Sequence, residues 1–109
     1  MKFKVTSEFD REFKRLSKKY KSLKSDIKVF TSELRVNPFK GEKIFTNCRK
    51  ARFAIKSKGK GKSGGGRVFF YYEVSQEYIT LLYIYDKSEM ENIQKNYIKQ
   101  ILRNNLKTE

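Results

Sequence analysis

The sequence contains no histidine and only one cysteine, Cys48, among its 109 residues. Histidine-based acid–base catalysis, cysteine–histidine nucleophilic catalysis and Cys/His zinc sites are therefore excluded. A disulfide within the chain is excluded as well, because it needs two cysteines. We expect neither a metal ion nor another cofactor, and we interpret Cys48 as a bystander thiol.

Long apolar runs are also absent. No stretch approaches the roughly 18 apolar residues that a membrane-spanning helix needs. The first ten residues, MKFKVTSEFD, lack the apolar segment of a signal peptide. We therefore expect a cytoplasmic protein that does not contact a membrane.

Acidic residues are scarce relative to basic ones. Lysine and arginine total 26 against 12 aspartates and glutamates, which gives a formal net charge of +14. Aromatic residues make up 15% of the chain, which is enough for a packed core and argues against a disordered basic tail. A folded domain this basic usually binds a polyanion such as RNA, DNA, an acidic membrane face or an acidic protein.

The middle of the chain, between Glu42 and Glu73, contains no acidic residue at all. An unbroken run of cations would repel itself strongly on an empty surface, whereas ordinary protein surfaces mix the two signs. We therefore favour polyanion binding over a merely solubilising role for this segment. Its nine cations are Lys43, Arg49, Lys50, Arg52, Lys56, Lys58, Lys60, Lys62 and Arg67.

The first 37 residues predict a strand followed by two helices. Residues 2–6 alternate in the manner of an edge strand, and Ser7 is placed to cap a helix, with Asp10 supporting it. Apolar residues then recur at helical spacing in two runs, and Pro38 ends the second. The two runs are Phe9, Phe13, Leu16 and Tyr20, then Leu23, Ile27, Phe30 and Leu34.

After Pro38 the hydrophobic pattern becomes that of a sheet. Residues 51–56 alternate, and residues 67–74 and 78–85 are near-continuous apolar and aromatic runs, so we predict three strands. The three residues 75–77 between the last two strands are short enough for a hairpin turn.

A last helix is predicted from Ser88 onward, where Ser88 and Glu91 form an S-x-x-E capping box. Its apolar stripe is Met90, Ile93, Tyr97 and Ile101. The resulting order β-α-α-β-β-β-α predicts one α+β domain over residues 1–109. We expect a small antiparallel sheet packed against an N-terminal helical hairpin and a C-terminal helix.

The stretch KSKGKGKSGGGR, residues 56–67, resembles two phosphate-binding loops without matching either. It satisfies G-x-G-x-x-G from Gly59 to Gly64, but a dinucleotide site needs a helix after this motif, and here strands are predicted on both sides. The Walker A pattern fails because Lys56 stands where its first glycine is required. We interpret the stretch as a flexible cationic hairpin tip, in which glycine allows close approach to a ligand.

Aromatic residues interleave with these cations. Such side chains can stack on bases, although alternate residues of the predicted strands must face the helices and therefore belong to the core. The residues concerned are Phe69, Tyr71, Tyr83 and Tyr85, of which Tyr85 is a candidate for RNA binding.

Four motifs occur together: R-K-x-R at 49–52, G-K-x-G-G-x-R-V at 61–68, Y-D-K-S-E at 85–89 and an N-P-x-x-G turn starting at Asn37. In this combination the chain resembles the RelE/HigB-like toxins of bacterial type II toxin–antitoxin systems (the RelE/ParE superfamily), most strongly over residues 49–93. The resemblance implies a RelE-like fold and a toxin that enters the ribosomal decoding site and cleaves mRNA. It also implies a cognate antitoxin, the ribosome and mRNA as partners.

The resemblance also suggests site residues. The family's arginine at the end of the basic hairpin corresponds to Arg67, and its basic residue after the last strand corresponds to Lys87. Basic residues of the preceding strand fall near Arg52 and Lys56. Where the best-studied members carry a catalytic tyrosine early in the last helix, this sequence has Glu91-Asn92-Ile93. The general base is therefore not identified by resemblance.

Metal-independent RNA cleavage by the 2′-hydroxyl needs a base, positive groups for the transition state and an acid. Arginine suits the second role because its planar fork matches phosphate oxygens, so Arg67 is the first candidate and Arg52 or Arg49 the second. We expect Arg67 at the exposed start of a strand, so that Arg67→Ala removes toxicity and leaves the fold intact. Lysine can transfer a proton where neighbouring like charges disfavour its ammonium form. The remaining candidates are Lys56, Lys62 and Lys87 for proton transfer, Glu89 as another base, and Arg49, Lys50, Lys58 and Lys60 for binding RNA.

Two other functions stay open. One is a ParE-like toxin of the same fold that inhibits DNA gyrase, and the other is a non-toxic RNA- or DNA-binding module. Gyrase-directed relatives need an extended helical hairpin, whereas the cations here concentrate in the sheet and its loop. This distribution favours RNA.

Overall fold

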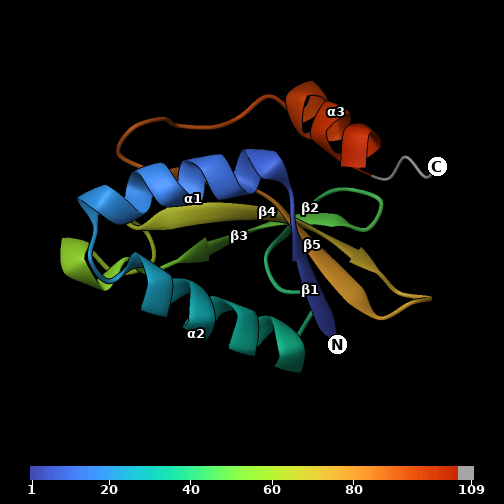
Figure 1. The fold of residues 1–109 in the computed structure, drawn as a ribbon, viewed down its shortest axis with the longest axis horizontal. Coiled ribbons are helices and arrows are strands. Elements are labelled where there is room, and N and C mark those ends of the chain that lie inside the picture. Colours follow the sequence, from blue (N-terminus) through green and yellow to red (C-terminus); the bar gives the residue numbers. More distant parts are fainter. Residues whose placement is uncertain (106–109) are drawn as a thin grey trace.

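The computed structural model of the protein describes residues 1–105. Within them, five strands form one sheet in the order β1-β5-β4-β3-β2, and three α-helices pack on it (Figure 1). Only β1 pairs in parallel, with β5, and the other neighbours are antiparallel. The α+β prediction is confirmed. The elements are β1 (Lys2–Val5), α1 (Ser7–Lys19), α2 (Leu23–Val36), β2 (Glu42–Phe45), β3 (Cys48–Phe53), the 3₁₀ helix η1 (Lys56–Lys58), β4 (Gly66–Glu73), β5 (Tyr78–Asp86) and α3 (Lys95–Asn105).

The sheet separates two layers of buried apolar side chains. Helices α1 and α2 cover one face, and α3 covers part of the other (Figure 1). None of the helices within residues 1–105 is long and apolar enough to cross a membrane. The first layer includes Phe9, Leu16, Leu23, Phe30, Leu34, Ala51, Phe53, Val68, Phe70, Ile79 and Ile84, and the second includes Cys48, Phe69, Leu82, Tyr83, Tyr85, Ile98 and Ile101.

Helix α1 is capped by Thr6 and not, as predicted, by Ser7. The Thr6 hydroxyl accepts the backbone N–H of Phe9 at 2.9 Å and donates to the carbonyl of Leu82 at 2.8 Å. Thr6 is buried, and its one side chain provides a hydrogen-bond acceptor for a free N–H group of the first helical turn and links that turn to β5. The neighbouring Ser7 is the first helical residue, and its exposed hydroxyl donates to Glu8.

Strand β2 is an element that the sequence pattern did not reveal, since its four residues show no clear alternation. It pairs with β3 across a tight turn in which Asn47 takes a positive φ of 62°, a conformation that asparagine tolerates better than most residues. This turn sets the start of β3 at Cys48. The strand then ends at Phe53, so the predicted strand 51–56 was placed too late in the chain.

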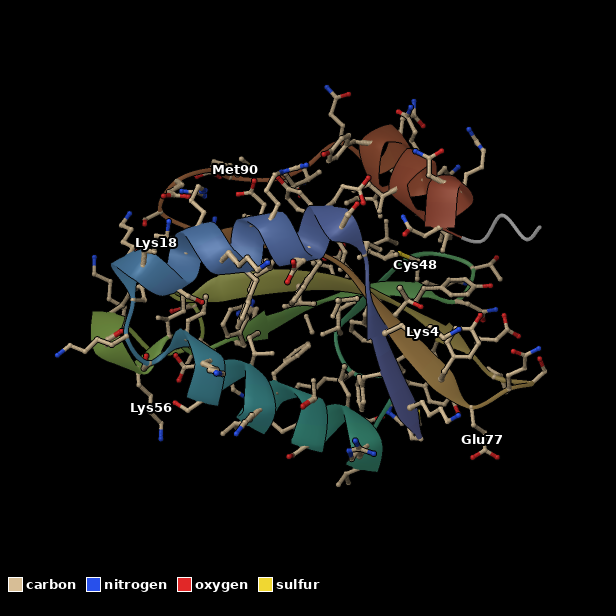
Figure 2. All side chains as sticks on the ribbon, in the orientation of Figure 1. Lys4, Lys18, Cys48, Lys56, Glu77 and Met90 are labelled. Carbon is tan, nitrogen blue, oxygen red and sulfur yellow. The ribbon has the colours of Figure 1, made fainter. Side chains whose placement is uncertain are left out.

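The last helix also begins later than predicted, at Lys95. The backbone N–H and the hydroxyl of Ser88 both donate to the Asp86 carboxylate, at 2.9 and 2.8 Å, so Ser88 closes a turn and caps no helix. Glu91 contacts Lys87 at 3.8 Å and takes no part in a capping box. Residues 87–94 therefore form an irregular segment that passes along α1, with Met90 on it, before α3 begins (Figure 2).

Candidate nucleic-acid interface

A row of three side chains crosses the second face of the sheet. Arg52 on β3 lies opposite Arg67 on β4, which in turn lies opposite Tyr85 on β5. Directly opposed residues of antiparallel strands share a face, with Cβ atoms about 4.5–5.5 Å apart. Two arginines thus stand side by side, and no carboxylate within residues 1–105 forms an ion pair with either.

This row borders a cavity of about 550 Å³, here called the cationic pocket. Its walls come from the β2–β3 region, the loop before β4, the end of β5 and the segment after it. Six positively charged side chains face two carboxylates, so the cavity is strongly positive. The lining residues are Lys40, Gly41, Glu42, Lys50, Ala51, Arg52, Lys62, Arg67, Tyr85, Lys87 and Glu91.

Arg67 is buried, with 7% of its surface exposed, whereas the sequence predicted an exposed position at the start of a strand. Its Nη1 donates to the carbonyls of Lys62 and Gly66, and its Nη2 donates to that of Ser63. Burial lowers the pKa of Arg67, and the neighbouring Arg52 adds a smaller effect in the same direction. Arg67 therefore holds the loop before β4 in shape. Of its five N–H groups, two remain for other partners.

Tyr85 lines this pocket, but both its ring and its hydroxyl are buried. The side chain is 3% exposed, and the ring packs against Phe69 with centroids 6.2 Å apart, which leaves no open ring face on which a base could stack. Within residues 1–105 the Tyr85 hydroxyl has no hydrogen-bond partner. Burial raises the pKa of Tyr85, while Arg67 opposes the shift, so the hydroxyl keeps its proton at neutral pH.

The loop of residues 56–65 is tethered and is not the flexible tip that its composition suggested. Lys58 Nζ donates to the fully buried carboxylate of Asp86 at 2.7 Å, and Tyr20 Oη donates to the same group at 2.5 Å. Burial alone would raise the pKa of Asp86, but its hydrogen bonds from Lys58, Tyr20 and Ser88 outweigh burial and hold it well below its usual range. Lys58, predicted to bind RNA, is instead engaged in an internal ion pair.

The first residues of this loop are fastened to the start of α2. The Asp26 carboxylate accepts the backbone N–H of Lys56 at 3.1 Å, and the Ser22 hydroxyl accepts that of Ser57 at 2.9 Å. The Lys56 side chain is exposed and projects outward near the start of α2 (Figure 2). Lys56 does not line the cationic pocket, so the structure does not bring it together with the other predicted catalytic residues.

The last glycines of the loop are required for close packing. A Cβ atom on Gly65 would lie 2.2 Å from the carbonyl oxygen of Phe53, and one on Gly66 would lie 2.5 Å from the Phe53 ring. Both distances are far shorter than any non-bonded contact permits, so only glycine lets the chain return against the end of β3. This return places the next residue, Arg67, opposite Arg52.

Two more predicted RNA-binding cations lie outside the pocket. Strand alternation puts Arg49 on the opposite face from Arg52, and its guanidinium donates to the carbonyls of Lys40 and Gly41 at 3.3 and 3.2 Å. Lys60 is exposed on the loop but does not line the cavity. Six of the ten predicted site residues therefore come together, namely Lys50, Arg52, Lys62, Arg67, Tyr85 and Lys87.

The carboxylates that line the pocket do not include Glu89, which the sequence suggested as a possible base. Glu89 bonds to Arg15 at 2.7 Å and to Lys19 at 3.3 Å on α1, away from the cavity, and the Arg15 hydrogen bond lowers the pKa of Glu89. Glu42 and Glu91 lie in the pocket instead. Glu42 could have been placed there only by recognising β2, where it pairs with Lys50.

The described residues contain no cluster of three or more cysteines, aspartates or glutamates that could hold a metal ion. No known protein-family model matches the chain. The pocket offers a set of buried and exposed cations, one buried tyrosine hydroxyl and two carboxylates, around a space large enough for a nucleotide phosphate and its sugar.

Proposed function

We propose that the protein is a ribosome-dependent endoribonuclease that cleaves mRNA, the toxin of a type II toxin–antitoxin pair, with the cationic pocket as its site of cleavage. The observation that carries the proposal is convergence: Arg52, Arg67, Lys62 and Lys87 come from separate parts of the chain to one cavity. Opposed like charges destabilise an empty site, and a phosphodiester would relieve that repulsion.

In the proposed reaction a base takes the proton of a 2′-hydroxyl, whose oxygen attacks the adjacent phosphorus. The bond to the 5′-oxygen of the next nucleotide breaks, and that oxygen takes a proton. Arg52 and Arg67 stabilise the additional negative charge of the transition state, because guanidinium groups match phosphate oxygens and stay charged. A 2′,3′-cyclic phosphate and a 5′-hydroxyl are the expected ends.

Proton transfer is assigned to groups at the more open side of the pocket. Lys62 is exposed and Lys87 is half-buried, so both can reach a substrate. Glu91, which lies 3.8 Å from Lys87, is a further candidate for the proton-accepting group. Single substitutions of Lys62, Lys87 and Glu91, with the cleavage rate measured over a range of pH, identify the base.

The proposal is tested in a reconstituted translation reaction, with the mRNA read by primer extension. The wild-type protein should give discrete breaks in the translated region, and only when ribosomes translate it. Arg52→Ala should reduce the cleavage rate at least about tenfold, since a lost charge-assisted hydrogen bond is worth about 1.5–3 kcal/mol. Arg11→Ala, which removes an exposed arginine of α1 outside the pocket, is the matched control and should cleave normally.

The alternative targets give different results in the same assay. If the mRNA stays intact while translation or growth still stops, the nuclease proposal is wrong and another target, such as DNA gyrase, must be tested with a supercoiling assay. If neither translation nor growth is affected, the protein is a binding module. A small reading frame for an acidic partner beside the gene would support the toxin assignment.

A further inference from the structure

Within residues 1–105 the Tyr85 hydroxyl has no hydrogen-bond partner, and Tyr85 lines the cationic pocket. Burying a hydroxyl without a partner lowers the stability of a fold, and native proteins rarely tolerate it without a reason. Tyr20 donates to Asp86 and Tyr71 donates to Glu73. Within residues 1–105 the Ser17 hydroxyl is also buried without a partner, but Ser17 does not line the pocket. The unpaired hydroxyl of Tyr85 at the pocket therefore points to a partner that is not part of the chain.

The neighbours of this hydroxyl define what that partner is. Arg67 lies directly opposite Tyr85 across β4 and β5, and Arg52 follows in the same row. The described residues supply Arg67 with carbonyl partners but with no carboxylate, so the row offers donors and positive charge and no matching acceptor. An anionic oxygen fits this arrangement, whereas a cation does not, because both arginines would repel it.

We propose that the Tyr85 hydroxyl and the Arg67 guanidinium form one oxyanion-binding pair, which holds a non-bridging oxygen of an RNA phosphodiester. This inference rests on the proposed function, because it identifies the ligand as the RNA backbone. A neutral donor suits the position, since a third cation beside two arginines would add further repulsion. Because the Tyr85 ring is covered by Phe69, this pair contacts the backbone and contributes no preference for a particular base.

The test compares Tyr85→Phe with Tyr83→Phe. Both residues are buried tyrosines of β5 on the same sheet face, but Tyr83 packs against Tyr97 of α3 and does not line the pocket. The first readout is thermal unfolding of the free protein. The second is binding of a 2′-O-methyl oligoribonucleotide, which cannot be cleaved, and of inorganic phosphate, followed by amide NMR shifts of β4 and β5.

The inference predicts that Tyr85→Phe is at least as stable as the wild type, because it removes an unsatisfied polar atom, and that it binds the oligoribonucleotide about tenfold or more weakly. Tyr83→Phe should bind like the wild type. A structural role for the hydroxyl would give the opposite result, with stability lost and affinity kept. Either equal affinity of Tyr85→Phe and the wild type or a destabilised Tyr85→Phe protein would overturn the inference.

Failure of the proposed function has a different signature. If the wild type binds phosphate at Tyr85 and Arg67 but leaves translated mRNA intact, the oxyanion-binding pair is kept and the nuclease assignment is wrong. If Tyr85→Phe cleaves mRNA as fast as the wild type does, the nuclease assignment is kept and the oxyanion-binding pair is wrong. If the wild type neither binds phosphate or the oligoribonucleotide nor cleaves mRNA, both are wrong.

Discussion

Arg52 and Arg67 lie directly opposite each other on β3 and β4, where both line the cationic pocket. Like charges at directly opposed positions destabilise a strand pair. Arg67 compensates by donating to three backbone carbonyls, whereas within residues 1–105 the Arg52 side chain makes neither a hydrogen bond nor an ion pair. The described fold therefore does not depend on a contact of the Arg52 side chain, which fits its proposed role in binding RNA.

Replacing Arg52 should separate stability from activity. Arg52→Gln is expected to raise the free energy of unfolding by about 0.5 kcal/mol, because it removes the repulsion from Arg67. It should at the same time lower mRNA cleavage at least about tenfold. Urea denaturation and primer extension measure the two effects, and Arg11→Gln, an exposed arginine on α1, is the control. A less stable Arg52→Gln protein would show that Arg52 has a structural partner.

Replacing Arg67 should affect the fold itself. Arg67→Ala leaves the carbonyls of Lys62, Ser63 and Gly66 without their donors, so we expect it to lose about 2–3 kcal/mol of stability. The sequence alone suggested that this variant would fold normally. Urea denaturation decides the matter, since an Arg67→Ala protein with wild-type stability would mean that water replaces the guanidinium at no cost.

The buried carboxylate of Asp86 should make stability depend on pH in the acid range. Its folded pKa lies below the unfolded value of about 3.9. The stabilisation it provides is therefore complete above about pH 5 and is lost as the pH falls through the lower folded value. Urea denaturation between pH 2 and 7 should show this loss in the wild type. Glu33 and Glu89, whose pKa values are lowered by Lys40 and Arg15, add to it.

Asp86→Asn isolates the contribution of that one group. The variant should lose about 3 kcal/mol near neutral pH, because the largely buried ammonium of Lys58 is left without its partner. It should also show a weaker acid dependence than the wild type. Asp86→Asn combined with Lys58→Met should recover part of the loss, and a double variant no better than the single one would contradict the ion pair as the cause.

The thiol of Cys48 should be almost inert in the folded protein. Cys48 is fully buried, and burial raises its pKa to about 12. At pH 8 the reactive thiolate is then about a thousandfold rarer than in an exposed cysteine. Iodoacetamide labelling followed by mass spectrometry should be slow for the native chain and fast in 8 M urea (a typical denaturing concentration). Native labelling at the rate of a free thiol would mean that β3 opens near its start.

Local patterns were enough to predict α1, α2, β4 and β5. Their apolar residues repeat at helical spacing or run continuously within one segment, and such a signal needs no knowledge of the rest of the fold. The exact first residue of α1 could not be predicted from the local sequence, because Thr6 and Ser7 are both good capping residues. The contact of Thr6 with Leu82, far away in the sequence, decides between them.

The late start of α3 has a similar cause. Ser88 and Glu91 have the right spacing for a capping box, but the Asp86 carboxylate competes for Ser88. That carboxylate can be buried only because Lys58 and Tyr20 bring their donors to it. A competitor of this kind is invisible in a local reading of the sequence.

The sequence by itself determined the strong positive charge, its concentration in an acid-free middle segment and the α+β class, because these depend on composition and short-range periodicity. Only the tertiary structure decided which cations act together. Pairing register aligns Arg52, Arg67 and Tyr85 in one row, strand alternation sends Arg49 to the other face, and Asp86 withdraws Lys58 into the interior. Register and burial are properties of contacts between distant segments, and for that physical reason no single stretch of the chain encodes them.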